Sequence, residues 1–132
     1  MKKIFQILWL PVLIFFFNIT PLAYHLYATQ PLFDVFMHAF GGFAIAYMFV
    51  VLLNVYKISW WKQIPLIWKI VIIAGFVMLF GVAWEWYEFL SDTFLGTHDQ
   101  PGLADTMYDM LFDFTGALIF CATKFGLLRN RK

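Results

Sequence analysis

Residues 66–90 read LIWKIVIIAGFVMLFGVAWEWYEFL, a stretch that contains one lysine and two glutamates among otherwise uncharged residues. A helix needs roughly 20 predominantly apolar residues to cross the hydrocarbon core of a bilayer. Lipid offers no hydrogen bonds, so a segment that crosses it must satisfy its backbone groups internally. We therefore expect a membrane-spanning helix here, which begins after Pro65, a residue that favours the first turn of a helix.

The composition of the whole chain also indicates that the protein lies in a lipid bilayer. Of its 132 residues, 63% are hydrophobic and 13% are charged, whereas soluble domains carry about 25% charged residues. A small soluble domain could not bury so much apolar surface, because it has too much surface for its volume. The single cysteine excludes a disulfide scaffold and a cysteine-based zinc site, and the net charge of +1 gives no indication of nucleic acid. We expect an integral membrane protein in contact with lipid.

Three further apolar stretches are long enough to cross the membrane. The sequence predicts an all-α, polytopic membrane protein that forms one domain over residues 1–132, a bundle of four transmembrane helices. The expected helices cover residues 3–19, 32–56, 66–90 and 104–128.

The first of these stretches has an alternative interpretation as a cleaved signal peptide. Lys2 and Lys3 precede its apolar run, and small residues follow near Ala28. We favour an uncleaved helix, because Pro11 interrupts the run and the sequence before Ala28 is a poor match to a cleavage site.

The basic residues predict the orientation of the bundle. With four crossings, all nine Lys and Arg residues fall on one side of the membrane, and cytoplasmic loops are the ones enriched in these residues. We therefore expect both termini to be cytoplasmic. The basic residues are Lys2, Lys3, Lys57, Lys62, Lys69, Lys124, Arg129, Arg131 and Lys132.

All eight acidic residues and all three histidines fall on the opposite side, in the outer halves of helices or in outer loops. An ionisable group inside a span costs roughly 2.5–3.5 kcal/mol near the bilayer centre. Five of these residues lie within apolar spans, so their presence requires an explanation. They are His38, Glu85, Glu88, Asp109 and Asp113.

Helical spacing gathers the acidic residues into stripes. Residues three or four apart share one face of a helix, and polar stripes in lipid must face the bundle interior or a water-filled cavity. Carboxylates and imidazole without thiolate suit a divalent zinc, iron, manganese or magnesium ion. The candidate metal ligands are Asp34, His38, Glu85, Asp92, Asp105, Asp109 and Asp113, and the candidate catalytic carboxylates are Glu88 and Glu85.

Other interpretations of these acids stay open. The carboxyls could share protons instead of a cation, or they could face an open, hydrated vestibule. Asp34 and Asp105 each lie near the start of an expected helix, where an acidic residue can cap free N–H groups. The small residues Gly41, Gly42 and Gly116 would let helices approach closely.

Three motifs together resemble the YjdF-type small inner-membrane proteins of bacteria and, more distantly, the VanZ-like family. The resemblance covers the second to fourth expected helices. It implies a multi-pass location in the bacterial inner (plasma) membrane and a polar site on the extracytoplasmic side. The motifs are Asp34-x-x-x-His38-x-x-Gly41-Gly42, then Trp84-Glu85-Trp86-Tyr87-Glu88 followed by Asp92, then Asp105-Thr106-x-x-Asp109-Met110-x-x-Asp113-x-x-Gly116-Ala117.

Two functions from different classes follow from these residues. One is a metal-dependent membrane enzyme that acts on a lipid-linked or envelope substrate, with Glu88 as a general base. The alternative is a cation- or proton-binding or transport module. The inner halves of the spans offer few polar residues, which argues against a channel in one subunit, while a site between subunits of a homo-oligomer stays open. A third interpretation is an envelope accessory protein without catalysis.

Overall fold

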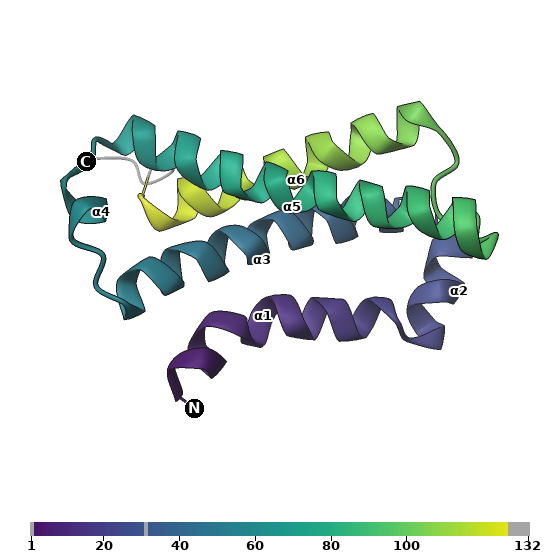
Figure 1. Cartoon of the computed structure of the whole chain (residues 1–132), viewed down its shortest axis with the longest axis horizontal. Coiled ribbons are helices and arrows are strands. Elements are labelled where there is room, and N and C mark those ends of the chain that lie inside the picture. The colour runs from purple at the N-terminus through teal and green to yellow at the C-terminus, as the bar shows by residue number, and fades with distance from the viewer. Residues whose placement is uncertain (1, 31, 127–132) are drawn as a thin grey trace.

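The computed structural model describes residues 2–30 and 32–126, and the regular structure in these ranges is entirely helical. The expected all-α class is therefore confirmed (Figure 1). In chain order the helices are α1 (Lys2–Asn18), α2 (Pro21–Thr29), α3 (Phe33–Val55), α4 (Ser59–Gln63), α5 (Leu66–Leu95) and α6 (Leu103–Lys124).

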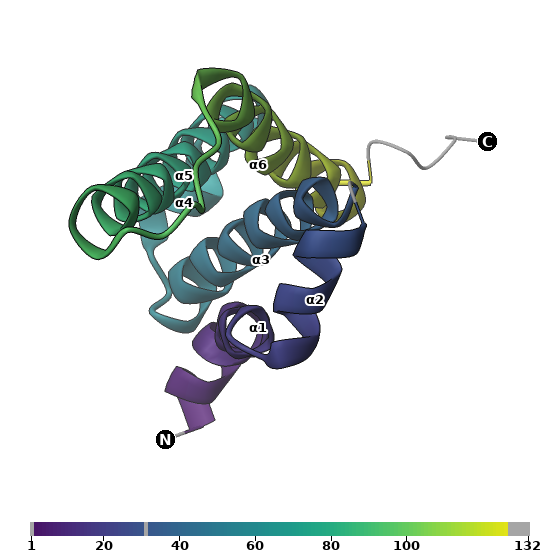
Figure 2. The ribbon, with the colours of Figure 1, turned by 90° about the vertical axis from the view of Figure 1, so that its right-hand side faces the viewer.

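The four long helices run along the length of the molecule, and the two short helices lie at its opposite ends (Figure 1). α3 packs against α1, α5 and α6, and the view along the bundle in Figure 2 shows it between α1 and the other two long helices. The start of α1, the short helix α4 and the end of α6 lie at one end of the bundle. The helix α2 and the loop between α5 and α6 lie at the other end.

The long helices lie close to the four expected ranges, and their ends have local causes. Thr20 caps α2, since its hydroxyl accepts a hydrogen bond from the main-chain N–H of Ala23 (3.2 Å), and Pro21 occupies the first turn. These residues start a separate short helix that was not expected from the sequence. α5 runs five residues beyond Leu90 and ends at Gly96, which adopts the left-handed conformation common at helix ends. The expected end of the last helix, at residue 128, lies outside the described residues.

Two of the helices, α3 and α5, are long and apolar enough to cross a bilayer. Their outward surfaces carry large apolar side chains, as on α5, where Leu79 is 65% exposed and Trp86 67% exposed. Such side chains would be costly in water, and they suit contact with lipid.

The interior of the bundle is divided along its length. Toward α4 it is apolar, with Val50, Leu53, Trp61, Ile73 and Phe120 buried together. Toward α2 it is polar, and the buried residues there include His38, Glu85, Asp109 and Asp113.

α3 and α6 cross with their main chains in contact. A Cβ atom added to Gly42 would collide with the carbonyl oxygen of Asp113, and one added to Gly116 would collide with the carbonyl oxygen of Ala39. Each helix therefore needs glycine at the crossing, as in other close helix pairs in membranes.

This crossing predicts the outcome of adding a methyl group. Gly116→Ala should lower the free energy of unfolding by about 1–3 kcal/mol, the usual cost of overpacking. Gly75→Ala is the matched control, because nothing lies within 4 Å of a Cβ at that position. The control should be neutral or slightly stabilising, since alanine favours a helix by about 0.5–1 kcal/mol over glycine. Thermal unfolding midpoints in one detergent measure both, and equal midpoints would contradict the close crossing.

Candidate functional site

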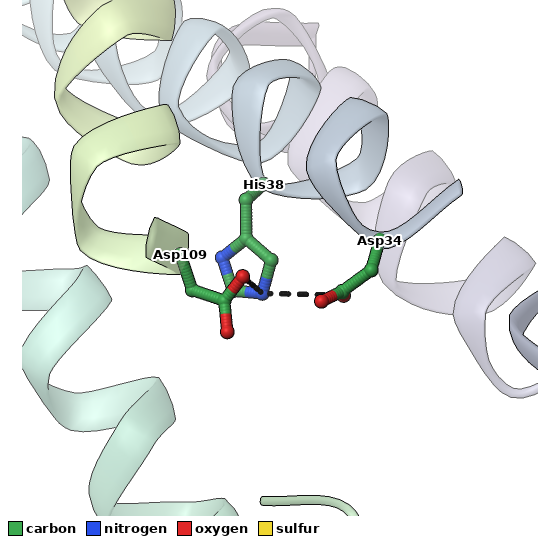
Figure 3. A group of neighbouring side chains, drawn as sticks. All are labelled: Asp34, His38 and Asp109. Carbon is green, nitrogen blue, oxygen red and sulfur yellow. Dashed lines mark ion pairs between the residues drawn. The ribbon is translucent and has the colours of Figure 1, made fainter. Parts of the chain in front are cut away.

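His38 lies at the centre of the polar end of the bundle, on the second turn of α3, and is only 8% exposed. Its Nε2 atom lies 3.6 Å from Oδ1 of Asp34 and 3.7 Å from Oδ1 of Asp109, as Figure 3 shows. Its Nδ1 atom lies 3.4 Å from Oδ1 of Asp113. One buried imidazole therefore has carboxylates at both of its ring nitrogens.

Helical spacing and the close crossing together build this group. Asp34 and His38 are four residues apart on α3, and Asp109 and Asp113 are four apart on α6, so each pair lies on one face of its helix. The α3–α6 contact at Gly42 and Asp113 lies one turn along α3 from His38. Because α3 and α6 lie this close together, the imidazole of His38 reaches both Asp109 and Asp113 of α6.

Asp113 is enclosed on a second side by α5. A Cβ atom added to Gly81 would lie 2.5 Å from Oδ2 of Asp113, so a larger residue there would force this carboxylate to shift. Asp113 is 7% exposed. The packing fixes its orientation toward the Nδ1 atom of His38.

Asp34, His38 and Asp109 together have the composition and spacing of a cation site. One ligand atom from each lies within 4.8 Å of the others. Ligand atoms around a tetrahedral zinc ion lie about 3.3 Å apart, since each bond is about 2.0 Å long. The separations of 3.6 and 3.7 Å from Nε2 are slightly longer than this, and they exceed an ordinary hydrogen bond. Small side-chain movements would close the three groups around one ion.

The arrangement around Nδ1 has the geometry of a supporting group. A histidine that binds a metal through one nitrogen usually donates its other ring N–H to a carboxylate, which fixes the ring. Asp113 occupies that position, on the side of the ring away from Asp34 and Asp109. The structure thus separates Asp113 from the three facing ligand atoms, although the sequence grouped it with them.

Glu85 lies apart from this group and is 5% exposed. Its Oε2 atom accepts a hydrogen bond from the side chain of Gln100 (3.2 Å), which also donates to Thr106 (2.8 Å). Its Oε1 atom is buried and has no hydrogen-bond partner among the described residues. A buried acceptor left without a partner costs about 1–3 kcal/mol, so Glu85 is a costly residue to bury.

Asp92 forms hydrogen bonds with the loop between α5 and α6, residues 96–102, which we call the outer loop. Its carboxylate accepts hydrogen bonds from the Thr97 hydroxyl (2.6 Å) and from the main-chain N–H groups of Asp99 (2.8 Å) and Gln100 (3.0 Å). Both of its oxygens are therefore used by the loop that follows α5. The structure does not bring Asp92 to His38, and it gives this predicted ligand a clear local contact of another kind.

A cavity of about 380 Å³ with several acidic residues in its wall opens beside the ligand atoms, and we call it the outer cavity. Glu88 lies on its wall, where its Oε1 atom accepts a hydrogen bond from the indole N–H of Trp84 (2.8 Å). Asp105 also lines the cavity but is not part of the three-residue group. The carboxylates that line the outer cavity are Asp34, Glu88, Asp99, Asp105 and Asp109.

A second cavity of about 270 Å³, the inner cavity, extends deeper between α1, α3 and α5. His38 and Asp113 lie on its wall, and the remaining lining is mostly apolar. Asn18, Tyr27 and Trp84 line both cavities, so the two spaces adjoin there. Trp84 belongs to one of the sequence motifs. Asn18 and Tyr27 were not among the predicted site residues, because neither spacing nor charge distinguishes them from other polar and aromatic residues near a membrane surface.

Known proteins provide two comparisons. A family model described as "Predicted membrane protein (DUF2238)" matches residues 4–130. The chain is also 35% identical over 101 residues to an uncharacterized protein of Thermotoga maritima, a match that covers 75% of this chain and 48% of that protein. The chain thus spans about half the length of this relative. No solved structure matches the chain.

The contacts of Asp92 predict a local effect on the outer loop. Asp92→Ala should speed amide hydrogen exchange at Asp99 and Gln100 by at least about tenfold, because each N–H loses a charged acceptor. Asp99→Ala is the control, since it keeps the main-chain N–H that bonds to Asp92. Unchanged exchange in Asp92→Ala would contradict the proposed hold on the loop.

Proposed function

The chain belongs to the DUF2238 family of predicted membrane proteins, and from that premise we propose that it is a membrane enzyme built around a divalent cation. The cation is held by Asp34, His38 and Asp109, and the substrate is a lipid-linked or envelope compound. The observation that carries the proposal is the convergence of these three ligand atoms within 4.8 Å beside the outer cavity.

The proposed topology has four crossings, made by α1, α3, α5 and α6, with both termini in the cytoplasm. It is supported by the shared end of the bundle at which α1 begins, α4 lies and α6 ends. The basic residues up to Lys124 lie near this end: Lys2 and Lys3 at the start of α1, Lys57 just before α4, Lys62 in α4, Lys69 near the start of α5 and Lys124 at the end of α6. Arg129, Arg131 and Lys132 lie outside the described residues. This orientation puts the acidic site on the extracytoplasmic side of a plasma membrane.

Three protein ligands and one open position are typical of a catalytic rather than a structural zinc site. Asp34 and Asp109 also line the outer cavity, so the open position faces a space that a substrate can enter. The Asp113 carboxylate supports the proposal as the group that orients His38. Zinc, iron, manganese and magnesium are the candidate ions.

The chemistry proposed is hydrolysis or group transfer. A divalent cation supplies Lewis acidity and lowers the pKa of a bound water molecule. Glu88 is the proposed general base, because it lines the same cavity and the Trp84 N–H fixes one of its oxygens, which leaves the other free to take a proton. Glu85, the second predicted catalytic carboxylate, does not line this cavity, and its hydrogen bond from Gln100 links it to the outer loop.

A second candidate function is transport of a cation or proton. It is favoured by the position of His38, which faces carboxylates of the outer cavity through Nε2 and Asp113 through Nδ1. The apolar core toward α4 offers no continuation of this path among the described residues, which favours the enzyme. The relationship to YjdF-type and VanZ-like proteins stays a prediction, and it does not distinguish the enzyme from the transporter.

Metal content tests the cation site. The purified protein should bind one zinc or manganese ion, and His38→Gln and Asp109→Asn should each abolish this binding. Asp113→Asn should weaken it about 10–100-fold, the usual effect of losing the carboxylate behind a histidine ligand. Asp99→Asn, on the cavity wall but outside the ligand group, is the control and should bind normally.

Elemental analysis and metal titration of the detergent-purified proteins measure these effects, with magnesium added because weakly held ions wash off. Absence of binding at every ion concentration, in protein that keeps its thermal unfolding midpoint, would overturn the cation site and favour carboxyls that hold protons.

Reporter fusions test the topology. A reporter fused after Lys132 should be active only as a cytoplasmic fusion, and one inserted at Asp99 only as an extracytoplasmic fusion. The reverse pattern would place the acidic site in the cytoplasm.

A further inference from the structure

The inner cavity has a lining that suits a hydrocarbon chain. Apolar side chains from three helices line it, including Ile14 of α1, Met37 and Ile45 of α3, and Val77 of α5. Phe15 of α1 and Phe80 of α5 also line it and are 51% and 41% exposed. The cavity is therefore bordered by exposed apolar side chains of two helices, which suit contact with lipid.

The inner cavity is not wholly apolar, and its polar end adjoins the outer cavity at Asn18, Tyr27 and Trp84. The volumes of about 270 and 380 Å³ each lie near or within the range of roughly 300–1,000 Å³ that small-molecule sites occupy. A ligand that fills both spaces needs an apolar body and a polar head. Membrane lipids have this form.

The charge of the outer cavity selects among lipid heads. Its wall carries five carboxylates and one histidine, His98, and no Lys or Arg of the described residues lines it. A divalent cation at Asp34, His38 and Asp109 offsets two of these charges. Glu88, Asp99 and Asp105 still face the remaining space, so a purely anionic head is repelled there.

A positively charged amino group fits this remaining space. It would interact favourably with Glu88 and Asp105, and Trp84 and Tyr87, which line the same cavity, supply aromatic rings of the kind that attract cations. A phosphate on the same head would lie at the proposed divalent cation. The two charges of the head therefore match two different parts of the cavity.

We infer that the substrate of this site is a zwitterionic aminophospholipid, with its phosphate at the divalent cation, its ammonium group at Glu88 and Asp105, and one acyl chain in the inner cavity. The inference rests on the proposed function, because it names the substrate class of the same site. It excludes anionic glycerol-headed lipids as the preferred ligand, although they carry the same chains and phosphate.

Lipid binding to the full-length protein, in detergent with saturating zinc, tests this inference. The probes are dioleoyl phosphatidylethanolamine, its N-acetylated form and dioleoyl phosphatidylglycerol, which share their acyl chains and differ in the head. Phosphatidylethanolamine should bind at least about tenfold more tightly than the other two. The combined variant Glu88→Gln/Asp105→Asn should reduce this preference to less than about threefold.

A matched pair of variants on α1 tests the proposed position of the acyl chain. Ile14→Trp fills the inner cavity and should weaken binding of phosphatidylethanolamine by about tenfold or more. Leu13→Trp adds the same side chain next to it, but Leu13 is 59% exposed and does not line the cavity, so binding should be unchanged. Equal effects of the two variants would overturn the assignment of the acyl chain to this cavity.

Metal titration of the same samples separates the two proposals. Equal affinity for the three lipids in protein that binds zinc would overturn the aminophospholipid and leave the cation site standing. A preference for phosphatidylethanolamine that survives in Glu88→Gln/Asp105→Asn would overturn the assigned ammonium position. A preference that is kept in protein without metal binding would support the amino-head recognition and overturn the cation site.

Discussion

Main-chain contact between α3 and α6 is the constraint on which the polar end of the bundle depends. Helices usually pack with their axes 8–10 Å apart, and here Gly42 and Gly116 remove the side chains that would hold them farther apart. Because of this approach, one imidazole on α3 reaches two aspartates on α6. Gly81 extends the same principle to α5, where it leaves room for the carboxylate of Asp113.

One half of the bundle contains the apolar core, and the other half contains the candidate site. The half toward α4 packs Val50, Ile73 and Phe120 closely, and the van der Waals contacts of this packing stabilise it. The other half buries carboxylates that repel one another, and it leaves Oε1 of Glu85 without a hydrogen-bond partner among the described residues. Such an arrangement destabilises a fold, so it is more readily understood as a site than as packing.

Much of the site followed from helical periodicity. The spacing of four residues on two helices predicted that Asp34 and His38, and likewise Asp109 and Asp113, would share inward faces, and His38, Asp109 and Asp113 are buried. Glu85 is buried as well. Periodicity could not anticipate Asp92, because its hydrogen bonds go to the following loop, whose path depends on residues that have no helical pattern. Periodicity also could not show that Asp113 lies at a different ring nitrogen of His38 from Asp109. Which nitrogen a carboxylate faces depends on how the two helices cross.

The sequence by itself determined that the chain is helical, that it belongs in lipid, and on which helix faces its acids lie. These properties depend on local composition and on the fixed rise and turn of a helix, so neighbouring residues are enough to define them. Only the tertiary structure decided which acids meet and what surrounds them: Asp34 and Asp109 at one nitrogen of His38, Asp113 at the other, and two adjoining cavities beside them. The contacts of His38 with Asp109 and Asp113 join residues more than 70 positions apart. They depend on interhelical distances that a few glycines set, and the pattern of one helix does not contain this information.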